Sequence, residues 1–293
     1  MDYIKEAQNI ISSKDGITAA YGYGSSFFHQ AGYNSKIVKS MDFIFVVDSL
    51  KEWLINDIAK NPEDYTENTR KRLLKLSAKK LKGRTGVIYN VVRDRKVNYK
   101  FGVIEKKDFI KHLSVWDSFY VTGRMQKPIY SFISTKELED VIDSNRENVL
   151  LTSLLILNKE KLNIYELFEM ICSLSYKGDI RFIIENPNKV SNIVRGNIDE
   201  LLNIYSKYDK YIKIDGENVS VNLDNVYSNA SKIPNYDKFK SKEKNKYGNY
   251  LLKHIKHINR SESICQPLKG LRVCGIKDSL SYVNEKAKKK KLK

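Results

Sequence analysis

Two stretches of the sequence decide the fold: residues 21–30 read YGYGSSFFHQ, and residues 39–48 read KSMDFIFVVD. The first breaks a short apolar run at a Gly-x-Gly-Ser turn, and the second is an apolar strand that begins with Asp42. Glycines let a backbone approach a phosphate closely, and the N–H groups that follow bind the anion if a helix starts there. A carboxylate on the adjacent strand can hold a divalent metal against the same phosphates. This layout is typical of a nucleotidyltransferase site.

Two features of these stretches leave the chemistry open. A lone Gly-x-Gly-Ser also occurs at plain strand-to-helix turns. The general nucleotidyltransferase pattern has a second acidic residue two positions after the first, and Ile44 occupies that position here. One candidate metal ligand, Asp42, is therefore present without its usual neighbour, and the motif indicates phosphate binding without fixing the reaction.

Net charge, cysteine content and the length of apolar runs limit the partners and the cellular location that we expect for this protein. The 293 residues carry a formal net charge of +17, which indicates a polyanionic partner such as nucleic acid, an anionic membrane surface or a phosphate-rich substrate. A Lys- and Asn-rich genome would produce the same bias. The three cysteines lack metal-type spacing and predict reduced thiols in a cytoplasmic protein. No apolar run is long enough to span a bilayer, and the N-terminus resembles neither a secretory signal nor a transit peptide.

The first 130 residues or so alternate helices with at least four strands, which predicts an α/β or α+β sheet domain. We expect helices over residues 3–13, 49–60, 67–82 and 108–116, with Ser49 and Asp108 as caps, and strands over residues 17–21, 43–47, 85–92 and 97–104. The last two strands form a predicted hairpin. The apolar strand 43–47 is expected to be buried on both faces.

Beyond Pro128 the pattern becomes helical. Helices are expected over residues 138–157, 164–175 and 190–208, the last broken near Gly196, followed by a hairpin over residues 211–221. Three helices and a hairpin predict a winged-helix-like domain. Residues 228–249 are polar and Lys-rich, and we expect a mobile linker or a loop there. Residues 276–293 place apolar residues at helical spacing and contain four consecutive lysines, 288–291, near the end. This pattern fits a helix that lies on an anionic bilayer, a solvated terminal helix or a tail that binds nucleic acid.

Three further groups of residues are candidates for binding phosphate. Lys100 lies on a strand that can neighbour the Asp42 strand, where it points either at a nucleotide or at solvent. Arg124 and Lys127 form a basic loop that either binds phosphate oxygens or complements a helix end. Asp179 and Arg181 follow a predicted helix, and they form either a structural ion pair or a contact with substrate across a cleft.

Seven blocks of this sequence, in order, resemble one family. They are YGS (23–25) with HQAG (29–32), MDFIFVVD (41–48), Trp53, GVIYN (86–90), KFGVI (100–104), GRMQKP (123–128) and LSYKGDIR (174–181). The family is the mitochondrial translocator assembly and maintenance proteins, the soluble-type phosphatidate cytidylyltransferases or CDP-diacylglycerol synthases, and this chain resembles a bacterial member. The resemblance covers residues 20–200, resumes weakly at Lys269, and includes an apolar residue where Ile44 stands. Ser26 departs from it, because mitochondrial members usually have glycine there, and residues 209–262 match poorly.

The resemblance implies an α+β architecture in three parts: a nucleotidyltransferase domain (1–130), a winged-helix-like domain (131–260) and a basic amphipathic, membrane-associating C-terminal helix (261–293). It implies Mg²⁺-dependent transfer from CTP to phosphatidic acid, giving CDP-diacylglycerol and pyrophosphate. It does not imply a nucleic-acid partner. The expected location is cytoplasmic and peripheral on the inner face of the cell membrane, or the matrix face of the inner membrane in a mitochondrion.

The resemblance also implies roles for ten residues, with Asp42, Lys100 and Arg124 as the catalytic ones. On this interpretation Asp42 binds Mg²⁺, and Lys100, Arg124 and Lys127 neutralise phosphate charge. Binding of the triphosphate is assigned to the turn and the second domain through Gly24, Ser25, Ser26, Lys127, Tyr176, Asp179 and Arg181. Two alternatives stay open at this stage: a winged-helix nucleic-acid-binding protein, and a nucleotidyltransferase acting on RNA or protein.

Overall fold

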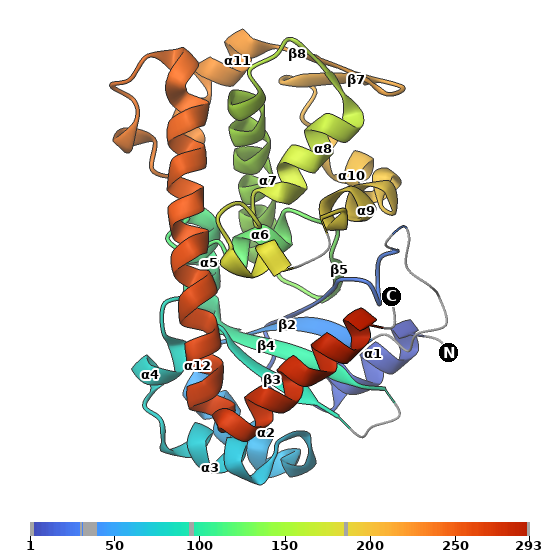
Figure 1. The fold of residues 1–293 in the computed structure, drawn as a ribbon, viewed down its shortest axis with the longest axis vertical. Coiled ribbons are helices and arrows are strands. Elements are labelled where there is room, and N and C mark those ends of the chain that lie inside the picture. Colours follow the sequence, from blue (N-terminus) through green and yellow to red (C-terminus); the bar gives the residue numbers. More distant parts are fainter. Residues whose placement is uncertain (1–2, 30, 32–39, 94–96, 185–186, 292–293) are drawn as a thin grey trace.

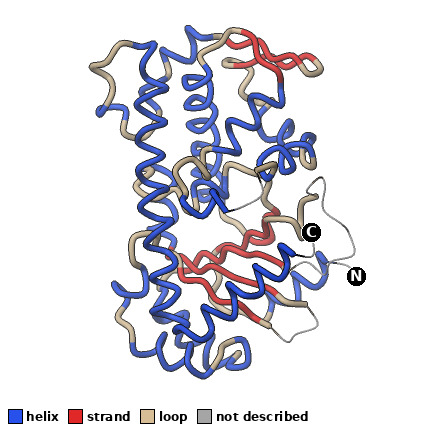
Figure 2. Tube along the Cα trace, in the orientation of Figure 1, coloured by secondary structure: helices blue, strands red, loops and turns tan. Residues whose placement is uncertain are grey.

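The computed structural model describes residues 3–29, 31, 40–93, 97–184 and 187–291. Its architecture is mixed α+β, with a large sheet in the lower half of Figure 1 and helices above it. One long helix, orange to red in Figure 1, runs past both parts, as the tube in Figure 2 also shows.

The large sheet has five strands in the order β3-β4-β2-β1-β5. The strands are β1 (Ala19–Tyr23), β2 (Met41–Val47), β3 (Ile88–Val92), β4 (Tyr99–Glu105) and β5 (Tyr130–Ile133). The central pair, β2 and β4, is parallel, whereas the other neighbouring strands are antiparallel. This register places Asp42 opposite Tyr23 on one side and opposite Lys100 on the other.

Strand β2 is buried on both faces because helices cover the sheet on each side. Phe43, Phe45 and Val47 lie in a cluster with side chains of α1 (Tyr3–Ser12), α2 (Leu50–Lys60) and α3 (Glu67–Lys75). Ile44 and Val46 lie in a second cluster with α5 (Lys106–Val115), α6 (Thr122–Met125) and the start of α7 (Lys136–Leu157). Since alternate residues of a strand face opposite sides, Asp42 belongs to the α5–α7 face.

The third hydrophobic cluster lies in the upper part of Figure 1. It contains the second half of α7 together with α8 (Ile164–Ser173), α9 (Lys189–Arg195), α10 (Ile198–Tyr205) and a small sheet of order β6-β8-β7. The strands of that sheet are β6 (Lys161–Asn163), β7 (Ile212–Asp215) and β8 (Asn218–Val221). Helix α7 joins the two parts, because Leu138 packs below the junction and Leu154 above it.

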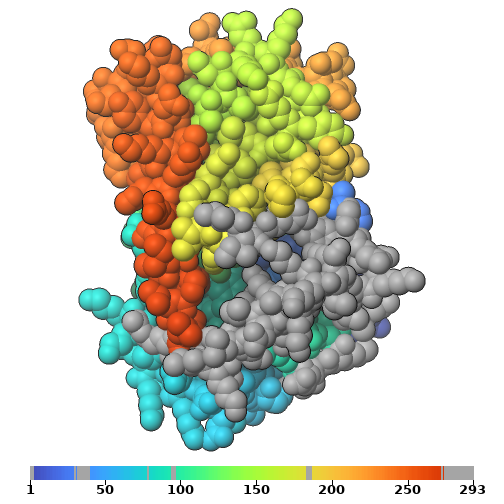
Figure 3. Space-filling model, in the orientation of Figure 1, coloured from blue at the N-terminus to red at the C-terminus, as the bar shows by residue number. Residues whose placement is uncertain are grey.

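The remaining elements are short, apart from the last helix. They are α4 (Ala78–Lys82), α11 (Leu223–Ser228) and the 3₁₀ turns η1 (Pro62–Asp64), η2 (Ile180–Ile184), η3 (Ala230–Lys232), η4 (Tyr236–Lys238) and η5 (Lys244–Lys246). The orange portion of helix α12 (Tyr247–Lys291) runs along one side of the molecule past both parts (Figure 3), and its red portion turns away from that line (Figure 1). Within the described residues, no helix is both long and apolar enough to cross a membrane.

Polar side chains on α12 bind backbone and side-chain groups of both parts. The Gln266 Oε1 atom accepts a hydrogen bond from Thr85 Oγ1 at 2.9 Å, and the Glu262 carboxylate accepts one from the Phe119 N–H at 3.2 Å. The Asn259 Nδ2 atom donates to the carbonyls of Leu174 and Lys177, each at 2.8 Å. Burial raises the pKa of Glu262 to about 7. Helix α12 therefore fastens the sheet to the helical part.

Most elements expected from the sequence are confirmed, including the β3–β4 pairing and the hairpin β7–β8. The sequence left open whether β2 and β4 are neighbours, and the structure pairs them in parallel. Two details were wrong. The expected helix 67–82 is two helices, because the chain is extended at Leu76 and Ser77. Glu105, not Asp108, is the N-cap of α5. Residues 228–249, expected to be a linker or loop, contain short 3₁₀ turns and the start of α12.

Glu147 provides a test of the packing in the helical part. Its Oε1 atom lies 2.8 Å from both Lys210 Nζ and Lys232 Nζ and accepts a hydrogen bond from Tyr211 Oη at 2.7 Å. Burial raises the pKa of Glu147, but these partners outweigh it and lower the pKa from 4.5 to about 2.

We expect Glu147→Gln to lower the free energy of unfolding at pH 7 by roughly 1–2 kcal/mol. The drop in pKa is equivalent to about 3 kcal/mol, which solvent screening reduces at this partly exposed site. Because the folded-state pKa is depressed, the stabilisation is present above pH 4.5 and is lost as the pH falls toward 2. Urea unfolding at pH 7 and pH 3 measures it. An equal deficit at both pH values would contradict the assignment.

Candidate active site

An acid–cation pair lies on the two parallel strands at the centre of the large sheet. Lys100 Nζ lies 3.7 Å from Asp42 Oδ1, and each side chain is 27% exposed. Gly24 adopts a φ of +80°, and a Cβ atom built there would lie 3.3 Å from Asp42 Oδ2. A side chain at this position would therefore crowd the carboxylate as well as strain the backbone. The structure brings together Gly24, Asp42 and Lys100.

The loop after Gly24 is a turn and not the start of a helix within residues 24–29. The N–H groups of Phe27 and Phe28 both bind the Gly24 carbonyl, at 3.2 and 3.0 Å. Ser26 Oγ donates to the Ser40 carbonyl at 2.8 Å, which ties the turn to the start of β2, and Ser25 is half-buried between them. The condition for anion binding at a helix N-terminus is therefore not met here. Gln30 and Gly32 lie outside the described residues.

Arg124 is held by aromatic rings. Its guanidinium carbon lies 3.9 Å from the ring centroid of Tyr120, 5.3 Å from that of Tyr23 and 5.9 Å from that of Tyr89. Arg124 Nη1 also donates to the Tyr120 carbonyl, and the hydroxyls of Tyr23 and Tyr89 lie 3.0 Å apart. Cation–π contacts of this kind fix both the position and the charge of an arginine. Because Tyr23 pairs with Asp42, this fixed cation lies near the carboxylate.

Lys127 lies against the segment that follows α8. Its Nζ donates to Ser175 Oγ at 2.7 Å and lies 4.4 Å from the centroid of the Tyr176 ring, while Lys189 Nζ lies 4.8 Å from the same centroid. Burial raises the pKa of Tyr176, but the two lysines outweigh it and the pKa is lowered. Two positive charges therefore converge on one tyrosine.

Asp179 and Arg181 form the ion pair that the sequence left as one of two alternatives. Arg181 Nε and Nη2 donate to the two carboxylate oxygens of Asp179 at 2.9 and 2.6 Å. Burial lowers the pKa of Arg181, and the bonds to Asp179 outweigh it and raise the pKa. Arg124 is near enough to act on the same pKa in the opposite direction. A role for this pair in binding substrate stays a prediction.

Two glycines lie so close to neighbouring segments that these segments pack directly against one another. A Cβ atom built at Gly123 in α6 would lie 2.3 Å from the Cβ atom of Ser175. One built at Gly178, whose φ is +87°, would lie 2.4 Å from the Lys256 carbonyl of α12. Glycine is needed at both positions because no side chain fits. Helix α6, which carries Arg124 and is followed by Lys127, is thereby packed against the segment with Tyr176 and Arg181.

The sequence did not assign roles to Tyr89, Tyr120, Ser175 or Lys189, which complete these contacts. Tyr89 carried a usable signal, because it lies on the hairpin strand next to the Lys100 strand. The contacts of Lys189 depend on how α9 packs, which no local pattern gives. Among the described residues, no group of three or more His, Cys, Asp or Glu side chains could hold a metal ion. Asp42 is therefore not part of such a group.

The loop after the Gly24 turn is docked onto the junction of α9 and α10. Asn197 Nδ2 donates to the His29 carbonyl at 2.7 Å, and the Ala31 N–H donates to the Asn192 carbonyl at 3.1 Å. A Cβ atom built at Gly196 would lie 2.4 Å from the His29 carbonyl oxygen. This close approach explains why the residue at the helix break is a glycine.

We expect Gly196→Ala to displace this loop, because the added methyl group occupies the position of the His29 carbonyl. The amide of Ala31 should then exchange with solvent roughly tenfold faster, since it loses a hydrogen bond of about 1 kcal/mol. Hydrogen exchange measured by mass spectrometry checks this. Gly270→Ala is the matched control, because nothing lies within 4 Å of a Cβ atom built there. Unchanged exchange in Gly196→Ala would show that the loop is held elsewhere.

The fold and the site define a mixed α+β protein with a carboxylate and several fixed cations at the junction of its two parts. The chain matches the family described as "Phosphatidate cytidylyltransferase, mitochondrial" over residues 7–225. It is 36% identical over 192 residues to the Schizosaccharomyces pombe protein of that name, covering 64% of this chain and 49% of the relative. The Caenorhabditis briggsae protein is 33% identical, and the match covers 70% of this chain and 64% of that relative. The Homo sapiens protein is 32% identical, and the match covers 64% of this chain and 43% of that relative.

The chain belongs to this phosphatidate cytidylyltransferase family. It spans between about half and two thirds of the length of the first three curated relatives that it matches. A solved structure titled "nucleotidyltransferase-like protein", from Exiguobacterium sibiricum, is 9% identical with a TM-score of 0.27, covering 92% of this chain and 76% of that one. A likeness at that score carries no argument about the fold.

Proposed function

We propose that this protein transfers the cytidylyl group of CTP to phosphatidate, giving CDP-diacylglycerol and pyrophosphate. The observation that carries the proposal is the Asp42–Lys100 pair beneath the Gly24 turn. The names of the family and of the relatives support the identity of the two substrates. Acid, cation and glycine turn meet at one end of the central strands, where a triphosphate can contact all three.

The residues present fit a magnesium ion. In nucleotide sites Mg²⁺ is usually bound by one or two carboxylates and completed by phosphate oxygens and water. Asp42 supplies one carboxylate, and glycine at position 24 keeps a side chain there from crowding its Oδ2 atom. Asp42 would hold the ion, with Asp179 as the candidate for a second ligand. The bound ion would supply charge neutralisation on the triphosphate.

The cations near Asp42 would bind and orient the phosphates. Lys100 lies beside Asp42, and Arg124 is fixed by three tyrosine rings, so both charges are in place before substrate arrives. Lys127 donates to Ser175 and Arg181 lies near Arg124, so both would add positive charge on that side. Charges that need no rearrangement stabilise a transition state more than mobile ones do.

The reaction itself needs little acid–base chemistry. A phosphatidate oxygen attacks the α-phosphorus of CTP in line, and the bond from that phosphorus to the bridging oxygen breaks. The bonding electrons leave with pyrophosphate, and no proton has to move first because the attacking phosphate is already anionic at pH 7. Positioning by the turn and neutralisation by Lys100, Arg124 and Lys127 therefore account for the proposed rate enhancement.

We also propose that the large sheet is a nucleotidyltransferase fold and that residues 131–260 contain a winged helix. The order α7, β6, α8, α9–α10, β7, β8 supports the second assignment, since the first short strand pairs with the last strand of the hairpin. In DNA-binding winged helices the third helix enters the major groove. Here the α9–α10 junction holds the loop at His29, which argues against a nucleic-acid partner.

An acceptor-swap assay tests the proposed reaction. Purified protein with Mg²⁺ and CTP should release pyrophosphate when vesicles contain phosphatidate, and should not when they contain phosphatidylcholine alone or when RNA is added instead. The lipid product is identified by mass spectrometry. Release of pyrophosphate that is independent of phosphatidate would overturn the proposed acceptor, and no release with any acceptor would overturn the activity.

We further propose that residues 276–293 bring the protein to an anionic membrane surface. The backbone of α12 continues as a helix through Lys291, and the segment carries a net positive charge. Each lysine near such a surface contributes about 1 kcal/mol to binding. Deleting residues 276–293 should abolish co-sedimentation with phosphatidate-containing liposomes and leave the melting temperature nearly unchanged. Unchanged co-sedimentation would refute the role of this segment.

A further inference from the structure

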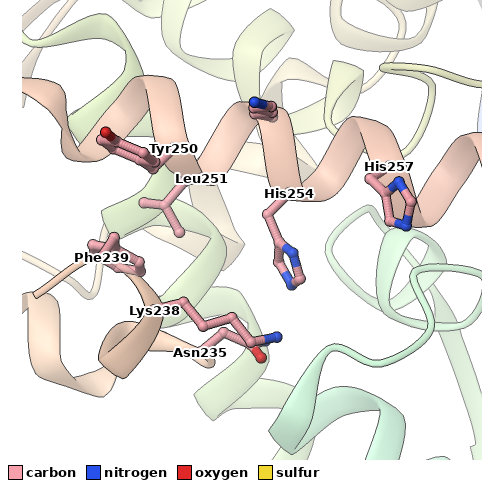
Figure 4. A pocket seen from close by; sticks show the side chains of 8 residues that line it. Asn235, Lys238, Phe239, Tyr250, Leu251, His254 and His257 are labelled. Carbon is pink, nitrogen blue, oxygen red and sulfur yellow. The ribbon is translucent and has the colours of Figure 1, made fainter.

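A pocket that takes no part in the site above lies between η4 and the first turns of α12. Its volume is about 310 Å³, and among the described residues that line it none carries a carboxylate. Figure 4 shows a basic group formed by Lys238, His254 and His257, and an apolar group formed by Phe239, Tyr250 and Leu251. The pocket is therefore amphiphilic and positively charged on its polar side.

His254 is the least satisfied group in this pocket. Its Nε2 atom is buried and has no hydrogen-bond partner. Burial lowers the pKa of His254, and the neighbouring Lys238 and His257 lower it further. A buried polar atom without a partner costs about 1–3 kcal/mol, so the arrangement is stable only if something compensates it. An anion placed among Lys238, Lys253 and His254 would supply both a hydrogen-bond acceptor and the missing negative charge.

The acidic residues close in sequence to the lining of this pocket form ion pairs with other lysines. Asp237, next to Lys238, pairs with Lys240 at 2.6 Å, and Glu243 pairs with Lys246 at 2.9 Å. A further cation, Lys242, lies 5.5 Å from the centroid of the Tyr250 ring, at the apolar end of the pocket. Positive charges therefore outnumber negative ones around the whole pocket.

We propose that this pocket binds an organic phosphate monoester, with the phosphate among Lys238, Lys253 and His254 and the organic group on Phe239 and Tyr250. Lysine and histidine donors suit a phosphate dianion. A volume near 300 Å³ is at the lower end of small-molecule sites and leaves room for more than a phosphate. The organic group can be an alkyl chain, as in a lipid phosphate, or an aromatic ring, as in a nucleotide. The proposal does not depend on the reaction proposed above.

Calorimetric titration of the full chain with hexyl phosphate and phenyl phosphate tests the proposal. The double variant Lys238→Gln/His254→Gln should bind the preferred ester roughly tenfold more weakly, since it loses two charge-assisted contacts. Lys256→Gln is the matched control, because it removes one charge from the same helix outside the pocket and should bind as the unaltered protein does. Tighter binding of the hexyl ester indicates a lipid-type ligand, and tighter binding of the phenyl ester a nucleotide-type ligand.

Three results would overturn the proposal. They are equal binding by the double variant, absence of binding by both esters, and binding of inorganic phosphate as tight as that of the esters, which would remove the role of Phe239 and Tyr250. Thermal melting of each variant shows whether it is folded. If the double variant does not fold, Lys253→Gln replaces it, because Lys253 is exposed on α12 and should still weaken binding several-fold.

Discussion

Replacing Asp42 with asparagine is expected to lower the rate of cytidylyl transfer by on the order of 10²–10³-fold or more. The substitution keeps the size of the side chain and removes the only charge on β2 that faces Lys100 and the Gly24 turn. A site without this carboxylate would neither hold a magnesium ion nor keep Lys100 oriented. Initial rates of pyrophosphate release at saturating CTP and phosphatidate measure the effect.

Asp48→Asn is the matched control for this experiment. Asp48 follows the other end of the same strand, where its Oδ1 atom accepts a hydrogen bond from Thr18 Oγ1 at 3.2 Å. We expect this variant to keep a rate within about twofold of the unaltered protein. Similar rates for Asp42→Asn and the unaltered protein would show that the reaction takes place elsewhere in the molecule.

Replacing Lys14 with methionine is expected to lower the free energy of unfolding by about 3–5 kcal/mol. Lys14 Nζ lies 3.1 Å from Asp57 and 2.6 Å from Asp64, and the three side chains are 0%, 2% and 4% exposed. Tyr65 and Tyr99 donate further hydrogen bonds to these two carboxylates. Without Lys14, these two buried carboxylates lose the ammonium group that lies within 3.1 Å of both. Chemical denaturation at pH 7 measures the loss.

An exposed ion pair nearby supplies the comparison. Lys60 Nζ lies 2.6 Å from Asp15, but these side chains are 47% and 74% exposed. Exposed pairs contribute less than about 1 kcal/mol, so Lys60→Met should change stability by no more than that. If both variants lost the same small amount, the buried cluster would not be a determinant of the fold.

The centre of the sheet could be predicted from the sequence because its signals are local. The apolar run after Asp42 identifies a strand buried on both faces, and the strand with Lys100 was a possible neighbour of it. The helix break at Gly196 was also visible. Its reason was not, because the residue that requires a glycine there is His29, which is far away in sequence.

The walls of the candidate site depend on contacts that no spacing encodes. Arg124 was expected in a loop that binds phosphate, whereas three tyrosines from separate segments surround it. The Lys14 cluster was missed for the same reason, because its members are 43 and 50 residues apart. Local pattern identifies which residues are charged, and tertiary packing decides which of them meet.

The contacts of α12 have a consequence for the order in which the molecule assembles. The Thr85 hydroxyl, the Phe119 N–H and the Leu174 carbonyl all find partners on this helix, and the first of these contacts joins residues 181 positions apart. Contacts between such distant residues form slowly, because a long chain must close before they yield any stabilisation. During synthesis the sheet and the helical part are made before α12, so their contacts with that helix form after it has been made. The junction that holds the candidate site is therefore completed last.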